Sequence, residues 1–339
     1  MTVVSDLLDE LPPEARALAV RAPQPDWVAP MLATLTEKRF SDPAWIFERK
    51  LDGERVLAFR RRGRVRLLSR NRLEAFGYPE VQEALAQRDG PDFVIDGEVV
   101  AFDGAQTSFA KLQQRMKLRD PSASARTRTR VFYYVFDVVH AGGFDVRGLE
   151  LRHRKALLRR LLAFGGPVRF TMHRNRDGER FHEEACRKGW EGLIAKRASS
   201  AYAGRRSPDW LKLKCVNEQE FVIGGFIDPK GSRAGFGALL IGYHEDGRLR
   251  YAGKVGTGFN EELLRSMRRQ MEGLERDTPP FVRDATGLPR KGVHWIEPKL
   301  VGQIGFAEWT RDGQLRHPRF QGLRRDKDPN EVIRERPGG

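Results

Sequence analysis

The stretch Glu48-Arg49-Lys50-Leu51-Asp52-Gly53-Glu54-Arg55 decides how the rest of the chain is interpreted. Apolar and aromatic residues of the kind found in β-strands flank it on both sides. We interpret it as the end of one strand, a tight Asp-Gly turn and the start of the next strand. Because side chains two residues apart share a face of an extended chain, Glu48, Lys50 and Asp52 can face one cleft.

Lys50 is the candidate nucleophile of this stretch. A free lysine has a pKa of about 10.4 and is protonated at neutral pH. Burial and nearby positive charge lower that pKa, and the neutral amine can then attack phosphorus. Arg55 and a metal ion can supply the positive charge, and Gly53 lets the backbone approach a ligand closely. The alternative is an ordinary Asp-Gly hairpin with a surface lysine, and this motif alone does not decide between the two.

Length and charge narrow the class of protein. The 339 residues favour two or more domains of about 100–200 residues each. Lysine and arginine total 61 against 46 acidic residues, which gives a formal net charge of +15. Such a surplus indicates a polyanionic partner, above all nucleic acid, and the alternative is a basic protein without such a partner.

The number of cysteines and the lack of long apolar runs indicate the cellular compartment of the protein. Cys186 and Cys215 are too few for a disulfide framework and fit a reducing cytoplasm, and the seven histidines show no zinc-site spacing. No apolar run of about 18 residues is present, and the N-terminus lacks a basic-then-apolar signal pattern. We therefore expect a cytoplasmic protein that does not bind membranes.

The pattern of elements divides the chain into three parts. Residues 1–30 are acidic and rich in proline, with leucines spaced for one or two short helices, which is typical of a linker or docking arm. Strands and helices follow up to about residue 216. Short strands, glycine corners and one helix near residues 260–273 then indicate a small barrel of the OB type, a frequent nucleic-acid binder.

Carboxylates in strand contexts are the next candidates. Asp96 and Glu98 lie inside an apolar strand, where burial is costly unless they have a ligand or a partner. Glu98 is expected to face a ribose or a metal, and the alternative is a pair with a structural arginine. Glu191 begins another strand that ends near Lys196, and the alternative there is an ordinary strand with charged ends.

Several cations and one aromatic residue complete the candidates. Lys212 and Lys214 share one face of a strand, which suits a triphosphate, although lysines also protect edge strands. Arg70 lies at a strand end that suits a phosphate, or else in a solvated turn. Phe136 can stack on a base or simply fill a core, and the basic run near the C-terminus can be a solvated charge run.

Seven short motifs occur in an order that resembles a known superfamily, the covalent nucleotidyltransferases, which comprise ATP-dependent DNA ligases, RNA ligases and mRNA capping enzymes. The motifs are Lys50-x-Asp52-Gly53-x-Arg55, Ser69-Arg70-Asn71, Asp96-Gly97-Glu98, Phe136-Asp137, Glu191-Gly192-x-x-x-Lys196, Lys212-x-Lys214 and Arg324-x-Asp326-Lys327. The resemblance covers about residues 30–335. The runs 228–233 and 251–258 look most like the ligase module of bacterial non-homologous end-joining ligases, the D type.

The resemblance implies an α+β fold. A mixed α/β nucleotidyltransferase (adenylation) domain with antiparallel sheets, residues 31–216, would precede a β-barrel OB-fold domain, residues 217–339. The implied activity is ATP-dependent DNA ligation, with lysyl-AMP formed on Lys50, AMP transferred to a 5′-phosphate and the 3′-hydroxyl closing the strand. The alternatives are an RNA ligase, a capping-type nucleotidyltransferase or a non-catalytic nucleic-acid-binding protein.

The resemblance also implies residue roles, with ATP and a divalent metal (Mg or Mn) as cofactors. Glu48 would contact the adenine, Phe136 would stack on it, and Arg55 and Glu98 would contact the ribose. Glu98 and Glu191 would bind the metal, and Lys212 and Lys214 would contact the phosphates of ATP. Arg70 would contact the phosphate at the nick, and Lys327, in the motif that begins at Arg324, would orient pyrophosphate.

The implied partners are nicked or broken duplex DNA and a Ku-like end-binding protein. We expect a monomer associated with the bacterial nucleoid. The sequence departs from the D-type pattern because it carries no polymerase or nuclease module, and residues 1–30 are too short for the extra DNA-binding domain of larger ligases. A stand-alone ligase and an excised module both stay open.

Overall fold

The computed structural model describes residues 4–116, 118, 127–229, 231, 233–282, 286–289 and 291–336. The described chain packs as two compact units, one up to Cys215 and one from Val216 to Arg336. Two members of the run 228–233, Lys230 and Ser232, lie outside the described residues.

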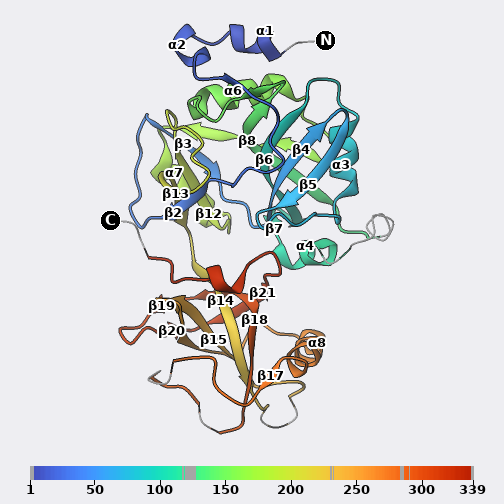
Figure 1. Ribbon diagram of the computed structural model, residues 1–339. Helices are drawn as coiled ribbons and strands as arrows, with labels where there is room; N and C mark the ends of the chain where they lie inside the picture. Colours follow the sequence, from blue (N-terminus) through green and yellow to red (C-terminus); the bar gives the residue numbers. More distant parts are fainter. Residues whose placement is uncertain are drawn as a thin grey trace. The chain divides into compact units, whose positions relative to one another are not determined.

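The first unit contains an eight-stranded sheet with the order β1-β9-β8-β6-β4-β5, to which β10 adds on β8 and β7 on β6 (Figure 1). The pair β10–β8 is parallel, and the other pairs among its described strands are antiparallel. The strands are β1 (Val20–Arg21), β4 (Glu54–Arg61), β5 (Arg64–Ser69), β6 (Phe93–Asp103), β7 (Gln106–Thr107), β8 (Val131–Ala141), β9 (Phe144–Asp145) and β10 (Val168–Phe170).

The second sheet of this unit has five strands in the order β11-β3-β12-β13-β2. Only its edge pair β13–β2 is parallel among the strands described. The strands are β2 (Leu32–Leu35), β3 (Trp45–Arg49), β11 (His173–Asn175), β12 (Gly192–Arg197) and β13 (Arg206–Lys214).

The segment Asp52-Gly53 connects the two sheets and is not a hairpin turn. β3 pairs with β11 and β12, whereas β4 pairs with β5 and β6. The two flanking strands are present as predicted, whereas the hairpin that was the alternative is excluded. The alternation of side chains predicts strands but not their partners. A Cβ on Gly53 would meet the carbonyl oxygen of Val99 at 2.2 Å, so this crossover requires glycine.

The described part of the first unit also contains four longer helices. They are α3 (Pro79–Ala86), α4 (Phe109–Met116), α6 (Leu151–Leu161) and α7 (Gly178–Arg187). Helix α6 buries an i, i+3, i+4, i+7 stripe that includes two cations, Leu151, Arg154, Lys155 and Leu158. No helix in the described parts of the chain is long and apolar enough to cross a membrane.

The N-terminal residues dock on the first unit. Helices α1 (Val4–Asp9) and α2 (Pro13–Arg16) lie beside α6 (Figure 1), and Glu10 forms an ion pair with Arg160. Leu8, Leu11 and Ala15 are buried in the core around the eight-stranded sheet. Strand β1 then adds to β9, so the arm is held both by apolar burial and by backbone pairing.

The second unit is built on a six-stranded antiparallel sheet with the order β16-β15-β14-β18-β17 and β21 on β18. Its elements are β14 (Asn217–Ile227), β15 (Ala238–Glu245), β16 (Arg248–Val255), α8 (Glu261–Glu272), β17 (Glu275–Arg276), β18 (Val293–Phe306), β19 (Glu308–Trp309), β20 (Leu315–Arg316), β21 (Arg319–Leu323) and the 3-10 turn η1 (Pro329–Glu331). Asn260 caps the N-terminus of helix α8, because its side chain accepts a hydrogen bond from the Leu263 amide at 2.8 Å, and the helix buries Met267 and Met271. The predicted α+β class with mainly antiparallel sheets is confirmed.

Removal of the Leu8 side chain tests the docking of the arm. Leu8 is 3% exposed, whereas Leu18 is 46% exposed. Leu8→Ala should cost at least about 2 kcal/mol of docking energy, which raises the population of undocked arm about 30-fold. Trypsin cleavage after Arg16, followed by mass spectrometry, measures that population. Leu18→Ala is the matched control and should cleave at the wild-type rate; equal rates for all three proteins would contradict the docked arm.

Candidate active site

Three neighbouring strands gather the candidate side chains on one face of the five-stranded sheet. The register aligns Glu48 of β3 with Ile194 of β12, and Ile194 with Lys212 of β13. Residues aligned across a sheet share a face, as do residues two apart along a strand. Lys212, Lys214 and Glu48 therefore lie on the same face, where sequence alternation predicted the two lysines together.

Lys50 and Glu191 meet at one end of these strands. The Lys50 amide donates a hydrogen bond to the Gly192 carbonyl at 2.9 Å, and its ammonium group forms an ion pair with Glu191 Oε1. Gly192 in turn pairs with Lys214, so this end carries both a candidate nucleophile and a candidate phosphate contact. Glu191 Oε2 is buried and has no hydrogen-bond partner among the described residues. A buried carboxylate oxygen with this freedom fits a divalent cation such as Mg²⁺.

Glu48 forms a buried ion cluster with Lys155 and Lys196. Its side chain is 2% exposed; Oε1 pairs with Lys155 of α6, and Oε2 lies 2.7 Å from Lys196 of β12. Burial alone would raise the pKa of Glu48, but the two ammonium groups outweigh burial and lower that pKa. Both oxygens of the predicted adenine contact are thus engaged by lysines.

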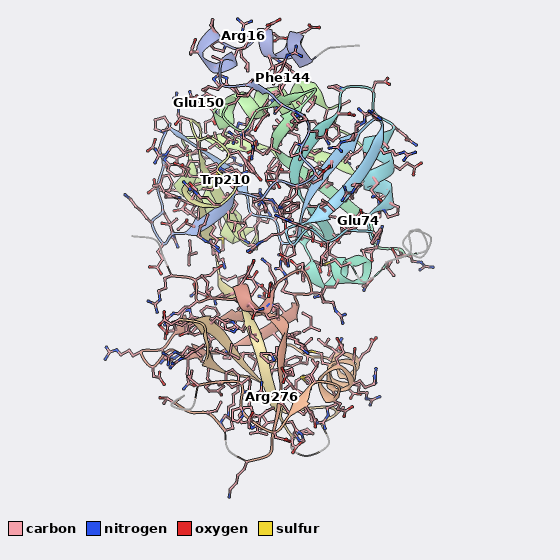
Figure 2. All side chains as sticks on the ribbon, viewed as in Figure 1. Arg16, Glu74, Phe144, Glu150, Trp210 and Arg276 are labelled. Carbon is pink, nitrogen blue, oxygen red and sulfur yellow. A yellow bond between two sulfur atoms is a disulfide. The ribbon has the colours of Figure 1, made fainter. Side chains whose placement is uncertain are left out.

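Phe136 and Trp210 form an aromatic wall next to this cluster (Trp210 is labelled in Figure 2). The Lys196 ammonium lies 4.1 Å from the Phe136 ring centre and 4.0 Å from that of Trp210. The Arg55 guanidinium lies 4.5 Å from the Phe136 ring, so two cations contact the predicted stacking residue. Burial lowers the pKa of Lys196 to about 8.

Arg55 is held by Asp96, the other carboxylate of the Asp96-Gly97-Glu98 motif. Two hydrogen bonds of 2.5 Å join the guanidinium of Arg55 to Asp96, which also accepts a hydrogen bond from Tyr202 Oη at 2.6 Å. Burial would lower the pKa of Arg55, but Asp96 outweighs it and raises that pKa. Asp96 is the carboxylate that partners an arginine, while the half-buried Glu98 aligns with Arg55 across the β4–β6 ladder.

A second buried pair, Arg154 with Asp137, was not predicted from the sequence. The two side chains are fully buried and joined by hydrogen bonds of 2.7 and 3.0 Å. A signal for Arg154 and Lys155 does exist, because both interrupt the apolar stripe of α6 at helical spacing. Cations at such positions need buried anionic partners, and the partners are residues of two other motifs.

Arg70 follows the last residue of β5. Ser69 aligns with Val56 of β4, so Arg70 lies alongside the start of β4, next to the Arg55 position. Its side chain is half-buried. The structure thus brings a further cation of the predicted set to the end of the strand that carries Arg55.

The C-terminal motif forms its own ion cluster within the second unit. Arg324 binds Asp326 through hydrogen bonds of 2.9 and 2.7 Å, and Lys327 lies 2.9 Å from Glu220 of β14. Burial would raise the pKa of Asp326, but Arg324 outweighs it and lowers that pKa. Glu220 was not predicted, since nothing in its strand pattern distinguishes it from a surface carboxylate.

The two cysteines are joined, contrary to the expectation of reduced thiols. Cys186 and Cys215 form a disulfide, with Cα atoms 5.2 Å apart and a separation of 29 positions in sequence. The expectation was wrong because helix α7 packs beside the sheet that contains β13, a proximity that sequence spacing does not encode. His182 lies beside the pair, and the ligand atoms of all three residues are within 4.8 Å of one another.

Comparison with known proteins gives a consistent class. Residues 30–214 match the family described as ATP dependent DNA ligase domain, and residues 232–327 match the ATP dependent DNA ligase C terminal region. The chain therefore belongs to the ATP-dependent DNA ligase family, with an adenylation domain followed by an OB-type domain as expected. Among the families that the sequence left open, this one is the DNA ligase family.

Within that family the chain resembles the LigD proteins. It is 38% identical to the multifunctional non-homologous end joining protein LigD of Pseudomonas aeruginosa over 94% of this chain and 38% of that protein. Identity to the LigD of Mycobacterium tuberculosis is 37%, over 91% of this chain and 40% of the relative. A solved mycobacterial DNA ligase D complexed with ATP and MES is 36% identical, covers 91% of this chain and 98% of its own, and superposes with a TM-score of 0.65. The chain spans about two fifths of the length of the full LigD relatives.

The low pKa of Lys196 predicts a pH dependence of stability. The folded chain releases this proton near pH 8, whereas a lysine in the unfolded chain keeps it to about pH 10.5. Between these values the unfolded state binds more protons, so this residue makes stability rise with pH. Lys196→Met should abolish that rise, measured as the difference in free energy of unfolding between wild type and variant by urea titration from pH 7 to 10. If the difference in free energy of unfolding between wild type and variant did not change with pH, the lowered pKa of Lys196 would be contradicted.

Proposed function

We propose that this chain seals nicks and breaks in duplex DNA through a lysyl-AMP intermediate on Lys50, in the repair of double-strand breaks by end joining. The observation that carries the proposal is the meeting of Lys50 with Glu191 beside Lys214, at one end of three adjacent strands. The family membership supports ATP as the nucleotide. The names of the LigD relatives support end joining as the setting.

In the first step the Lys50 amine attacks the α-phosphorus of ATP. A phosphorus–nitrogen bond forms as the nitrogen gives up a proton to solvent, the bond to the bridging oxygen breaks, and pyrophosphate leaves. The ion pair with Glu191 and the hydrogen bond from the Lys50 backbone amide to the Gly192 carbonyl hold the lysine in one position, which supports in-line attack. Phosphoryl transfer depends on such positioning and on neutralisation of charge more than on covalent assistance.

Lys212 and Lys214 supply charge neutralisation from the same sheet face. Their half-buried ammonium groups would contact the phosphates, where desolvation strengthens the attraction. Glu191 and Glu98 would hold a divalent cation, Mg²⁺ or Mn²⁺, which adds positive charge at the phosphates when bound. The free oxygen of Glu191 is the feature that fits this role.

The nucleoside would lie against the aromatic wall. Phe136 would stack on adenine, Glu48 would contact the adenine, and Arg55 with Glu98 would hold the ribose. The buried clusters support this arrangement, because they fix Arg55 and the Phe136 ring before any ligand arrives. A site ordered in advance avoids the cost of ordering on binding.

In the later steps the adenylated lysine transfers AMP to DNA. A 5′-phosphate oxygen attacks the AMP phosphorus and frees Lys50, and the 3′-hydroxyl then attacks the 5′-phosphorus and displaces AMP. Arg70 would contact the 5′-phosphate of the nick. The excess of basic residues supports binding of duplex DNA. A Ku-like protein would deliver broken DNA ends to this chain. The chain would act as a monomer in the bacterial nucleoid.

The C-terminal motif would act in the first step alone. We place Lys327 at the leaving pyrophosphate in that step and away from the site once DNA binds, which requires a hinge near residues 215–217. The contact of Lys327 with Glu220 supports a defined resting position for its ammonium group within the second unit.

Substitution of Lys50 tests the chemistry directly. Lys50→Ala should form no covalent adduct with ATP labelled in the α-phosphate, because the substitution removes the amine that meets Glu191. A denaturing gel followed by peptide mapping measures the adduct. Lys38→Ala, at an exposed lysine of the same unit, should label like wild type. An adduct mapped to any residue other than Lys50 would overturn the mechanism.

Substitution of Lys327 separates the steps. Lys327→Ala should lower lysyl-AMP formation about 100-fold, because one charge is lost from the stabilisation of pyrophosphate. It should still seal a nick whose 5′ end already carries AMP. Single-turnover gels with ATP and with pre-adenylated nicked DNA give the two rates, and Lys299→Ala, an exposed lysine of β18, is the control. Equal defects in both assays would show a general structural or DNA-binding role for Lys327.

A further inference from the structure

The disulfide between Cys186 and Cys215 encloses the phosphate end of the candidate site. Cys186 lies in the last turn of α7, and Cys215 directly follows β13. The chain between them forms β12 and β13 and carries four residues of the site, Glu191, Lys196, Lys212 and Lys214. All four residues therefore lie within the loop of chain that the disulfide closes.

Cys215 is also the last residue of the first compact unit. The boundary falls between Cys215 and Val216, and β14 begins at Asn217. The Cys215 amide donates a hydrogen bond to the Glu191 carbonyl at 3.0 Å, and the disulfide fixes the same residue to α7. With the bond formed, only the 55% exposed Val216 separates a cross-linked residue from the next strand.

Both cysteines are open to exchange. Each residue is half-buried rather than enclosed in the core. Partly exposed disulfides are the labile ones, and in reducing compartments a lone disulfide is usually transient and acts as a redox sensor. Neither cysteine has a part in the adenylation chemistry derived above, so the pair is available for another purpose.

We propose that Cys186 and Cys215 form a reversible thiol–disulfide site that controls the freedom of the connector between the two units. A dithiol reductant opens the bond: two thiols of the reductant become its disulfide, and their two electrons and two protons produce the Cys186 and Cys215 thiols. The oxidised form holds the end of β13 against α7. The reduced form leaves residues 215–217 free to bend.

The consequence for the reaction rests on the proposed two-position cycle. Lysyl-AMP formation requires the second unit to bring Lys327 to the site, whereas sealing of a pre-adenylated nick does not. The oxidised form should therefore be slow in the first step and normal in the last. The chemical reversibility of the bond does not depend on that cycle, so the two parts are tested separately.

The first measurement counts thiols in the full chain. After equilibration in glutathione buffers from reducing to oxidising, acid quenching and maleimide labelling, mass spectrometry should find two labels under reducing and none under oxidising conditions, reversibly. Cys186→Ser should carry one label under reducing conditions and a glutathione adduct on Cys215 under oxidising conditions, an adduct that oxidised wild type lacks. Two labels in the oxidised protein would overturn the site. Retention of one zinc ion per chain by the reduced protein, lost in His182→Ala, would also overturn it, because the trio would then be a metal site.

The second measurement compares rates in the two redox states. Oxidation should slow single-turnover lysyl-AMP formation about 10-fold, a loss that a dithiol restores, while sealing of pre-adenylated nicked DNA changes less than about twofold. Cys186→Ser and Cys215→Ser should keep the reduced rate in both buffers. Equal rates of wild type in both states, with the disulfide demonstrated, would overturn the control of the connector. A reduced protein that forms no lysyl-AMP would instead overturn the proposed function.

Discussion

The buried ion cluster of Glu48, Lys155 and Lys196 is the constraint on which the rest of the first unit depends. Removing three charges from water costs several kcal/mol each, and their attraction offsets that cost only in a well-defined geometry. The cluster ties β3 and β12 of one sheet to α6, a helix that packs on β8 of the other sheet. The relative position of the two sheets is therefore set by an interaction that tolerates little displacement.

Two further buried pairs extend this rigidity. Arg55 is joined to Asp96, and Arg154 to Asp137, and in each pair the guanidinium makes two hydrogen bonds to the carboxylate. Such paired forks fix orientation as well as distance. Lys50 and Glu191 lie at the more exposed end of the same strands, with 19% and 10% of their side chains exposed. Rigid buried ion pairs below a more accessible lysine are expected of a site that must hold reacting atoms in line.

The sequence predicted strands, helices and most candidate residues, because local alternation and motif spacing carry that information. It did not predict partners that are distant along the chain. Glu48 and Lys155 are 107 residues apart, and no local pattern links them. The same limit explains the unpredicted crossover at Asp52-Gly53 and the unforeseen disulfide, since each depends on which elements become neighbours. Of the two carboxylates flanking Gly97, the sequence could not tell which one binds Arg55.

The pairing of the earliest strands with late ones has a consequence for synthesis on the ribosome. Strand β1 aligns Val20 with Asp145, and β2 aligns Thr34 with Leu211. β1 and β2 are synthesised before their partner strands and cannot complete their pairing until residues far along the chain are available. Long loops must close before these contacts form, which makes folding slow. Until then the leucines of the arm and the unpaired β2 stay exposed, so a nascent chain of this ligase needs protection from association until most of its first unit has been made.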